Sequence, residues 1–232
     1  MSVSFNLSER LKTVKNAVDK CNCVADIGCD HGYVSISLLM DGVASKVIAC
    51  DVNEGPLKAA KENISNAGLS DCIETRLGDG LHKITTDDKV DALVIAGMGG
   101  RLMARILDEG LEVVSNCSQL VLQPQSENFL VRQWLYEHGF IIEREFMVED
   151  MGKFYWIIDA KNGTYVGPSE EDLKVIYDEF SEYLLNQKNQ VLKKYLDNQL
   201  LLCNQYLKGI EEGKGDNLKA TIEKLKKALE LY

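Results

Sequence analysis

The sequence predicts an α/β domain with a largely parallel sheet, followed by a helical appendage. Short apolar runs alternate with amphipathic stretches from Val24 onward, which is typical of strands and helices that alternate along a chain. The first apolar run ends in a glycine turn that leads directly into a helix. Beyond Pro168 the chain is almost free of glycine and proline, so we expect only helices there.

The composition fits one large domain with an appendage. The chain has 232 residues, of which 45% are hydrophobic, so it can bury a sizeable core. Its net charge of −10 argues mildly against a general nucleic-acid-binding protein, which usually presents a basic surface. The charge is uneven: residues 161–232 hold 11 lysines and 12 acidic residues, and residues 1–160 hold 15 basic and 24 acidic residues. A local basic patch that binds a polyanion remains open, and such binding would weaken with salt.

An amphipathic helix is expected first, over residues 8–20. Its apolar face consists of Leu11, Val14, Ala17 and Val18. The basic residues around the rest of this helix are Arg10, Lys12, Lys15 and Lys20. We leave open whether they form only a solvated face.

Strands and helices then alternate up to residue 138. Strands are expected at 23–27, 46–50, 73–77, 92–95 and 120–122. The helices that follow them are expected at about 33–41, 56–66, 101–114 and 126–138, with none after the third strand. Pro56 and Gly68 mark the two ends of the helix that follows the second strand.

The alternation of strands and helices ends near residue 140. Two strands, at 140–148 and 154–158, are separated by a segment too short for a helix, so they form a hairpin. A sheet that ends in an antiparallel pair resembles the seven-stranded, Rossmann-like fold of class I methyltransferases. It differs from the pattern of nicotinamide-dependent dehydrogenases.

Asn162-Gly163 and Gly167-Pro168 mark a boundary between two domains. We therefore expect a cofactor-binding domain over 1–163 and a coiled-coil domain over 168–232. The second should be an antiparallel helical hairpin, with a break near 186–189 and a turn at Gly213-Lys214-Gly215-Asp216 that Asp216 caps. Its apolar stripe is expected at Leu184, Val191, Tyr195, Leu202, Tyr206 and Ile210, and in the last helix at Leu218, Ile222, Leu225 and Leu229.

Acidic residues stand at the ends of the first three strands. Asp26 precedes the glycine turn, where it would repel the pyrophosphate of a dinucleotide but could bind the ammonium of S-adenosylmethionine. Gly28 lets the backbone approach the ligand, and N–H groups of the following helix face its carboxylate. Asp51, with Val52 beside it, is placed to bind the ribose hydroxyls, and Asp79 with Gly80 to bind the adenine. Each acid alone could be a cap or turn residue, but together they favour S-adenosylmethionine.

The fourth strand ends in Ala96-Gly97-Met98-Gly99-Gly100. Enzymes that methylate exocyclic amines often have an Asn/Asp-Pro-Pro-aromatic motif here, and its absence makes such a target less expected. Gly97 and its neighbours either leave space for the cofactor and a flat base or simply form a tight turn.

Several segments together resemble one family. They are Leu7-Ser8-Glu9-Arg10-Leu11, Asp26-Ile27-Gly28-Cys29-Asp30-His31-Gly32-Tyr33, Gly78-Asp79-Gly80-Leu81, Ile95-Ala96-Gly97-Met98-Gly99-Gly100 and Leu122-Gln123-Pro124-Gln125. In this order they resemble the bacterial tRNA (adenine(22)-N1)-methyltransferases, the TrmK family, over residues 7–160. The family's C-terminal coiled coil matches the helical tail in kind. Gly32 and Gln125 depart from the alanine and asparagine that are frequent there, which casts little doubt on cofactor binding.

The resemblance implies S-adenosyl-L-methionine as cofactor, tRNA as partner and Asp30 as the catalytic acid that faces the target base. Adenine N1 carries an in-plane lone pair and no proton, so it can attack the methyl group directly. A nearby carboxylate would stabilise the positive charge that grows on the base. For His31 three roles stay open: it orients Asp30, lines the cofactor pocket or donates to backbone.

The cysteine spacing and the hydropathy of the chain argue against a metal site and a membrane span. The seven cysteines show no CxxC spacing, so we expect reduced thiols and no metal site. There is no long apolar run and no signal-like N-terminus at Met1–Asn6, so we expect a cytoplasmic protein without a membrane span. For the oligomeric state we favour a monomer.

Two further functions remain open. One is methylation of a small molecule, which suits the acidic charge but leaves the tail unexplained. The other is non-catalytic RNA binding by a retained cofactor fold, against which the three strand-end acids argue. The tail could recognise RNA with its lysines. It could instead be a dimerisation or stabilising hairpin.

Overall fold

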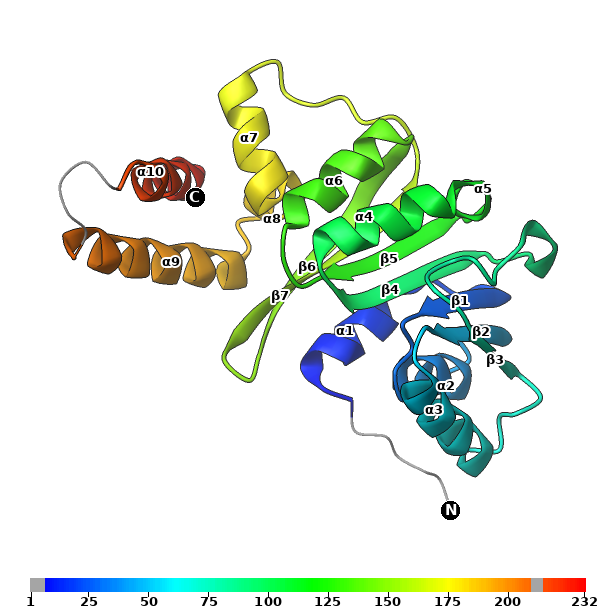
Figure 1. The fold of residues 1–232 in the computed structure, drawn as a ribbon. Coiled ribbons are helices and arrows are strands. Elements are labelled where there is room, and N and C mark those ends of the chain that lie inside the picture. Colours follow the sequence, from blue (N-terminus) through cyan, green and yellow to red (C-terminus); the bar gives the residue numbers. More distant parts are fainter. Residues whose placement is uncertain (1–6, 210–214) are drawn as a thin grey trace. The chain divides into compact units, whose positions relative to one another are not determined.

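The computed structural model describes residues 7–209 and 215–232 (Figure 1). The chain divides into two compact units, Met1–Tyr165 and Val166–Tyr232. The seven cysteines are all free thiols. In the described ranges no cluster of histidine, cysteine or acidic residues could hold a metal ion. The same ranges contain no helix long and apolar enough to cross a membrane.

The first unit contains a seven-stranded sheet in the order β3-β2-β1-β4-β5-β7-β6. The strands are β1 (Cys23–Ile27), β2 (Lys46–Asp51), β3 (Ile73–Leu77), β4 (Ala92–Met98), β5 (Gln119–Pro124), β6 (Phe140–Asp150) and β7 (Lys153–Asn162). Strands β1 to β5 pair in parallel, β7 pairs antiparallel with β5, and β6 antiparallel with β7. The predicted class I methyltransferase fold, with its terminal hairpin, is therefore confirmed.

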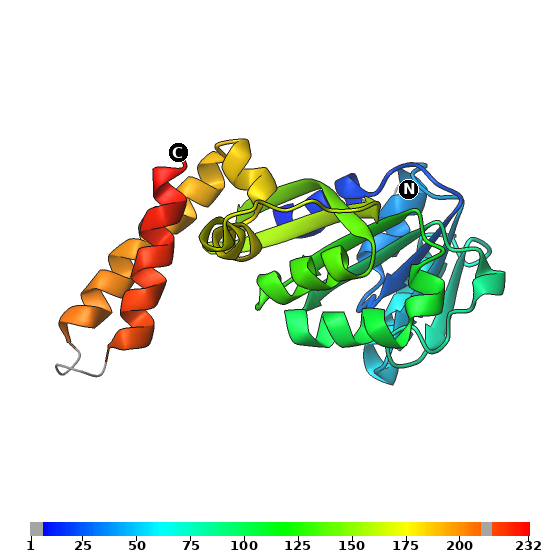
Figure 2. The same cartoon turned by 90° about the horizontal axis from the view of Figure 1, so that it is seen from above.

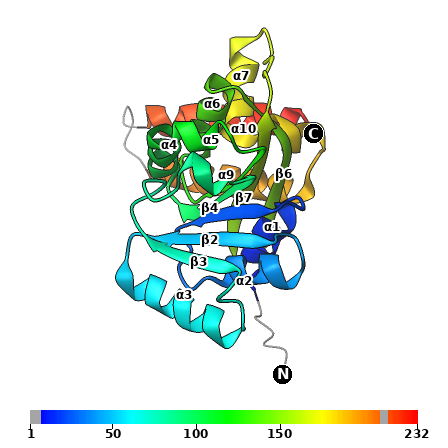
Figure 3. The ribbon, with the colours of Figure 1, turned by 90° about the vertical axis from the view of Figure 1, so that its right-hand side faces the viewer.

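Helices cover both faces of this sheet. They are α1 (Glu9–Ala17), α2 (Tyr33–Met40), α3 (Glu54–Asn66), α4 (Gly100–Glu109), α5 (Leu111–Val114) and α6 (Asn128–Glu137), with a 3₁₀ turn η1 (Thr86–Asp88). Side chains of α1, α2 and α3 belong to the buried cluster on one face, and those of α4, α5 and α6 to the cluster on the other (Figures 1 and 3).

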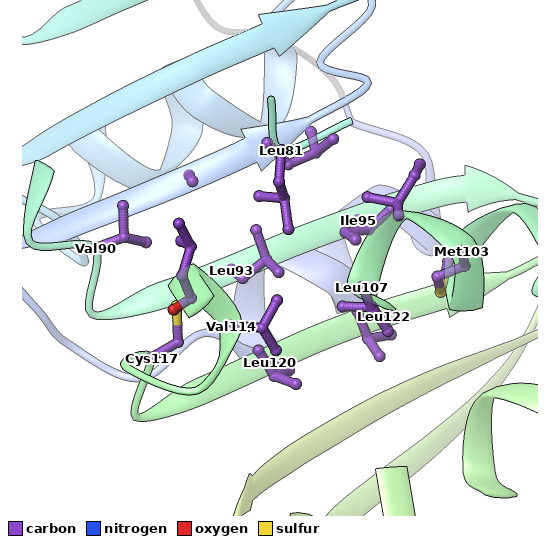
Figure 4. Close-up of a cluster of buried hydrophobic side chains, with 14 of the residues drawn as sticks. Leu81, Val90, Leu93, Ile95, Met103, Leu107, Val114, Cys117, Leu120 and Leu122 are labelled. Atoms are coloured by element: carbon purple, nitrogen blue, oxygen red, sulfur yellow. The ribbon is translucent and has the colours of Figure 1, made fainter. Parts of the chain in front are cut away.

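Alternation along the central strands divides the core between these two faces. Leu93 and Ile95 of β4 pack with the cluster under α4, whereas Ala92 and Val94 pack with the opposite cluster. Figure 4 shows the first cluster, in which Leu93 and Ile95 lie near Leu120 and Leu122 of β5 and near Met103 and Leu107 of α4. Because β1 and β5 are buried along their whole length, they can only be central strands.

The helix expected over 101–114 is in fact two helices, because Gly110 separates α4 from α5. Leu81 packs directly against this glycine, and a Cβ added to Gly110 would lie 2.3 Å from Leu81 Cδ1. The apolar pattern over 101–114 is continuous and gives no sign of this break. The break lies where Gly110 contacts Leu81, a residue distant in the sequence.

A buried polar network fixes the C-terminal end of α1 to the sheet. Asp159, which is 0% exposed, accepts from Arg144 Nε at 2.6 Å and from Gln119 Nε2 at 2.7 Å. Arg144 Nη2 and Gln119 Nε2 also donate to the carbonyl oxygen of Ala17, at 3.1 and 2.9 Å. Burial raises the pKa of Asp159. These bonds hold α1 across the ends of β5 and β7, so the residues at its other end have a fixed position.

A fully buried ion pair joins α6 to β6. Arg132 Nη2 donates to Glu145 Oε1 at 2.5 Å, and both side chains are 0% exposed. We expect Glu145→Gln to lower the free energy of unfolding by about 3–5 kcal/mol, because the buried Arg132 guanidinium loses a charged partner. Urea unfolding measures this change. In the control, Glu143→Gln removes a half-exposed partner of Lys161 and should cost below about 1 kcal/mol. Equal effects of the two substitutions would contradict a stabilising role for the buried pair.

The second unit is helical. It contains α7 (Glu171–Phe180), α8 (Glu182–Asn186), α9 (Gln190–Lys208) and α10 (Asp216–Glu230), and α9 and α10 lie side by side (Figures 1 and 2). The expected break is confirmed, because Asn189 caps α9 by accepting from the N–H groups of Val191 and Leu192. Asp216 is the first residue of α10, with Gly215 as its cap, so its predicted capping role is wrong.

The predicted apolar stripe of α9 is partly wrong. The buried residues of this helix are Leu192 and Leu196, whereas Leu202 and Tyr206 are 42% and 68% exposed. The prediction counted the heptad positions continuously from Leu184 through the break. Because a new helix begins after its cap Asn189, a different set of positions faces the core. In α10, Ile222 and Leu225 are buried as expected. Ile210, Gly213 and Lys214 lie outside the described residues.

Candidate functional site

A cavity of about 300 Å³ opens where the carboxyl ends of β1 and β4 meet. Ligands of open α/β sheets bind at this edge, and the volume lies at the lower end of the range for small-molecule sites. Its lining residues are Arg10, Leu11, Asp26, Gly28, Cys29, Asp30, His31, Tyr33, Val34, Ala96, Gly97, Met98 and Gln125. It therefore brings together the predicted residues Asp26, Gly28, Asp30, His31 and Gly97.

The glycine turn is tied to the end of β2. The N–H groups of Gly28 and Cys29 both donate to the carbonyl of Cys50, at 2.8 and 2.9 Å. Gly28 has φ +73°, a conformation that strains residues with a Cβ, so the glycine is required there. Asp30 adopts φ +50°, which aspartate tolerates better than most residues. The turn thus presents the Asp30 side chain at a fixed point of the cavity.

Asp26 is the buried acid of the site. It is 4% exposed, and Ser35 Oγ on α2 donates to its Oδ2 at 2.5 Å. Burial raises the pKa of Asp26 to about 6, against the hydrogen bond from Ser35, and the nearby Asp51 carboxylate adds to the rise. Burial destabilises the charged form of this carboxylate, so a cation bound next to it would stabilise that form.

Asp30 and His31 line the cavity but remain open to solvent. Their side chains are 70% and 48% exposed, and His31 Nε2 lies 3.7 Å from Asp30 Oδ1. The His31 ring stacks on Tyr33, with 5.6 Å between ring centroids. Asp30 is therefore accessible to an incoming substrate, and His31 lies close enough to influence its orientation.

Asp51 lies just outside the cavity lining, at the end of β2. It is 7% exposed, and its two oxygens accept backbone N–H bonds from Asp30 at 3.1 Å and Asn53 at 2.8 Å. The carboxylate thus holds the glycine turn in place, which is the turn role left open for each strand-end acid. Val52, beside it, is 58% exposed, as suits a residue against which a flat ligand packs.

Asp79 and Gly80 also lie outside the cavity lining. Asp79 is exposed and pairs with Arg105 of α4 at 3.4 Å. Gly80 has φ +52°, and an added Cβ would lie 3.1 Å from the Ile106 side chain, so a glycine is needed at this position. Asp79 can contact a ligand only at the outer side of the site.

The glycines at the end of β4 leave the cavity open. A Cβ added to Gly97, which has φ +81°, would lie 3.6 Å from Gln125 Nε2 and 3.7 Å from Arg10 Nη1. The Gly97 N–H donates to Gln123 Oε1 at 3.1 Å. Gly97 thus borders open space, whereas Gly100 fits a tight turn, because a Cβ added to it would lie 2.3 Å from the carbonyl oxygen of Glu127.

Arg10 is the site residue that the sequence pattern missed. It lies in the first turn of α1, and its Nη1 donates to Gln123 Oε1 at 2.7 Å. Its backbone N–H donates to Asp150 Oδ2 at 3.2 Å. Helical periodicity placed it on a polar face, and only its place within the Leu7–Leu11 segment signalled a function.

The residues present fit S-adenosylmethionine. The cavity holds an acid that is protected from water, a glycine turn that admits close approach, and an open acid at its mouth. A dinucleotide would bring its pyrophosphate to the glycine turn, next to the carboxylate of Asp26, and this repulsion disfavours such a ligand.

The chain matches the model of a methyltransferase domain family over residues 7–158. It is 34% identical to the tRNA (adenine(22)-N(1))-methyltransferase of Bacillus subtilis over 82% of this chain and 80% of that protein. It resembles a Streptococcus pneumoniae protein solved in complex with S-adenosyl-L-methionine, with 33% identity, a TM-score of 0.86, and coverage of 97% and 100%. It also resembles Mycoplasma capricolum TrmK in complex with S-adenosyl-homocysteine, with 26% identity, a TM-score of 0.85, and coverage of 97% and 98%.

Proposed function

This chain belongs to the tRNA (adenine(22)-N1)-methyltransferase family, and on that premise we propose that it methylates N1 of an adenine in tRNA, at position 22, with S-adenosylmethionine as donor. The observation that carries the proposal is one cavity that combines the protected acid Asp26 with the open acid Asp30. The first suits the cationic end of the donor, and the second suits a base that becomes cationic. The strand-end positions of Asp51 and Val52, and of Asp79 and Gly80, support contacts to the ribose and the adenine of the donor.

The donor supplies an electrophilic methyl group on a sulfonium. Adenine N1 has no proton to lose, so the protein needs no strong base before the attack. It must align N1 with the methyl group and stabilise the positive charge on the methylated ring. Asp30 can do the second, because its exposed carboxylate lies at the cavity and can also accept a hydrogen bond from the exocyclic amine.

The target adenine must leave its stacked position to reach this site, because a paired base hides N1. Gly97 lines the cavity without a side chain, and the exposed Gln125 lines it beside Gly97. A flat base placed there would face Asp30 across the cavity.

The pH dependence of donor binding follows from Asp26. With its pKa near 6, Asp26 is ionised above pH 6 and neutral below it, while the donor ammonium stays charged. We expect affinity for S-adenosylmethionine to fall about tenfold from pH 7 to pH 5, measured by calorimetry. Asp26→Asn should bind weakly at both values, with a flat profile. A profile in Asp26→Asn as steep as that of the unmodified chain would show that another group titrates.

The helical unit is proposed as an RNA-binding element. Its lysines Lys193, Lys219, Lys224, Lys226 and Lys227 pair with acidic residues of the same unit, so their charges are partly balanced. Recognition of RNA shape through short-range contacts suits this surface better than long-range attraction. A cytoplasmic, monomeric enzyme remains our expectation.

Transfer of a labelled methyl group from S-adenosylmethionine to bulk tRNA tests the proposed function. Label in tRNA supports it. Label that enters only small molecules of an extract would indicate a small-molecule methyltransferase. Binding of tRNA without any transfer would indicate a non-catalytic RNA-binding protein.

A further inference from the structure

The hairpin of β6 and β7 extends past the rest of the sheet on the side of the cavity. In the part of the chain that the structure describes, β7 pairs with β5 only over residues 158–160, and residues 153–157 pair with β6 alone. At about 3.4 Å per residue, the tip lies roughly 17 Å beyond the last pair with β5. Figure 1 shows this overhang beside α1, at the edge of the sheet where β4 leads into α4.

The tip of the hairpin is fixed next to the cavity. Asp150, the last residue of β6, accepts the backbone N–H of Arg10 with its Oδ2 at 3.2 Å, and Arg10 lines the cavity. Tyr155 of β7 packs on the Arg10 guanidinium, with 5.5 Å between its ring centroid and Cζ. A turn of two residues, Met151 and Gly152, lies directly beyond these contacts. Its position relative to the cavity is therefore set by β6, β7 and α1 together.

Met151 is an unexpected residue for this turn. Its φ is +49° and that of Gly152 is +74°. Type I′ turns require a positive φ at both positions and favour Asn-Gly. Met151 is 96% exposed, the largest value among the exposed large apolar side chains of the described residues, so it gains no packing inside the protein. The residue is thus unfavourable both for the turn and for contact with water, and contact with a binding partner would explain why it is there.

A positive charge follows the turn. Lys153 is exposed and forms no ion pair within the ranges that the structure describes. The tip therefore combines one apolar side chain with one cation. Proteins that enter a base stack use these two groups, because apolar side chains insert between bases and lysines contact phosphates. A protein partner fits less well, since one exposed side chain is much less than the apolar surface of a protein interface.

The target adenine would leave a gap that such a side chain can fill. It must leave its stack to reach the cavity, and its two neighbours are then separated by an empty position. We propose that Met151 enters this gap and that Lys153 binds an adjacent phosphate of the tRNA. Methionine suits the gap, because its thioether is flexible and polarisable and packs well on aromatic rings. The inference rests on the proposed function and adds to it an RNA contact in the first unit.

Met151→Asn in the full chain tests the proposal. Asparagine favours this turn, so the variant should fold, and Met151 does not line the cavity, so affinity for S-adenosylmethionine should stay unchanged. We expect the single-turnover rate of tRNA methylation to fall about 10- to 100-fold, because nothing replaces the adenine in its stack. Met151→Leu keeps an apolar side chain and should recover most of the rate. Met40→Asn is the matched control and should change nothing, because Met40 is 49% exposed at the end of α2 that lies opposite the cavity residue Tyr33.

A tRNA with 2-aminopurine in place of the target adenine gives a readout that does not depend on methyl transfer. This base fluoresces more strongly when it leaves a stack. The unmodified chain with S-adenosylhomocysteine should therefore raise the fluorescence, and saturating Met151→Asn should raise it much less. Lys153→Gln should weaken tRNA binding and reduce the slope of log affinity against log salt concentration by about 1.

Three results would overturn the proposal. The first is an unchanged methylation rate in Met151→Asn. The second is a reduced rate with the fluorescence of the unmodified chain, because Met151 would then act after the adenine has left its stack. The third is an equal loss of affinity for S-adenosylmethionine, which would mean that the hairpin only maintains the shape of the cavity. Absence of tRNA methylation by the unmodified chain would instead contradict the proposed function.

Discussion

Asp30→Asn is expected to lower kcat for tRNA methylation about 100- to 1,000-fold, the range found when one group that stabilises a transition-state charge is removed. The substitution keeps the shape of the side chain and removes its charge. The methylated adenine is cationic, so the carboxylate interacts more strongly with the transition state than with the neutral base. Single-turnover kinetics with saturating tRNA measure this change directly.

Affinity for the donor should change little in the same variant. The Asp30 side chain is 70% exposed, and the contact that ties this residue to β2 is made by its backbone N–H, which donates to Asp51. Asp41→Asn provides a matched control, because Asp41 is an exposed acid at the other end of α2. Normal turnover in Asp30→Asn would remove Asp30 from the mechanism. Equal losses in both variants would point to a general effect of surface charge.

Deletion of residues 168–232 is expected to reduce tRNA methylation by on the order of 1,000-fold, because the truncated chain loses the short-range contacts of the helical unit to phosphates and 2′-hydroxyls of the RNA. Binding of S-adenosylmethionine should persist. All residues that line the cavity lie between Arg10 and Gln125, and the unit that contains them has its own core on both faces of the sheet. Calorimetry with S-adenosylmethionine shows whether the truncated chain is folded and intact.

Kinetics over a range of tRNA concentrations then assign the function of the tail. A rise in KM for tRNA with intact donor binding supports RNA docking. Full methylation activity of the folded truncation would instead assign the tail to stability or assembly. The full-length chain with Lys46→Gln is a useful control, because this half-exposed lysine pairs with Glu74 in the first unit and is no part of the tail.

Local patterns were sufficient to predict the strands of the first unit. Runs such as Val47–Cys50 are short and apolar throughout, because parallel strands of a covered sheet are buried on both faces. The acids at the ends of these runs are equally visible in the sequence, because a charged residue stands out next to an apolar run. The sheet order brings Asp26, Asp30 and Gly97 to one edge, as the alternation of strands and helices predicts.

What the sequence patterns missed depends on contacts between distant segments. Arg10 is one polar residue among several on an amphipathic helix, and only the packing of α1 against β5, β6 and β7 directs it into the cavity. The break at Gly110 reflects its close contact with Leu81. The wrong face was predicted for α9 because the heptad positions were counted through the break between two helices. Asn189 caps the second of these helices.

Reverse transcription of the methylated tRNA shows which atom of the adenine has received the methyl group. A methyl group on N1 blocks the Watson–Crick edge of adenine, whereas a methyl group on the exocyclic amine still allows pairing. After incubation with the enzyme and S-adenosylmethionine, we expect the transcriptase to stall at a single adenine, at position 22. The stall should disappear when S-adenosylmethionine is omitted. Read-through of a tRNA that has demonstrably received a labelled methyl group would contradict methylation at N1.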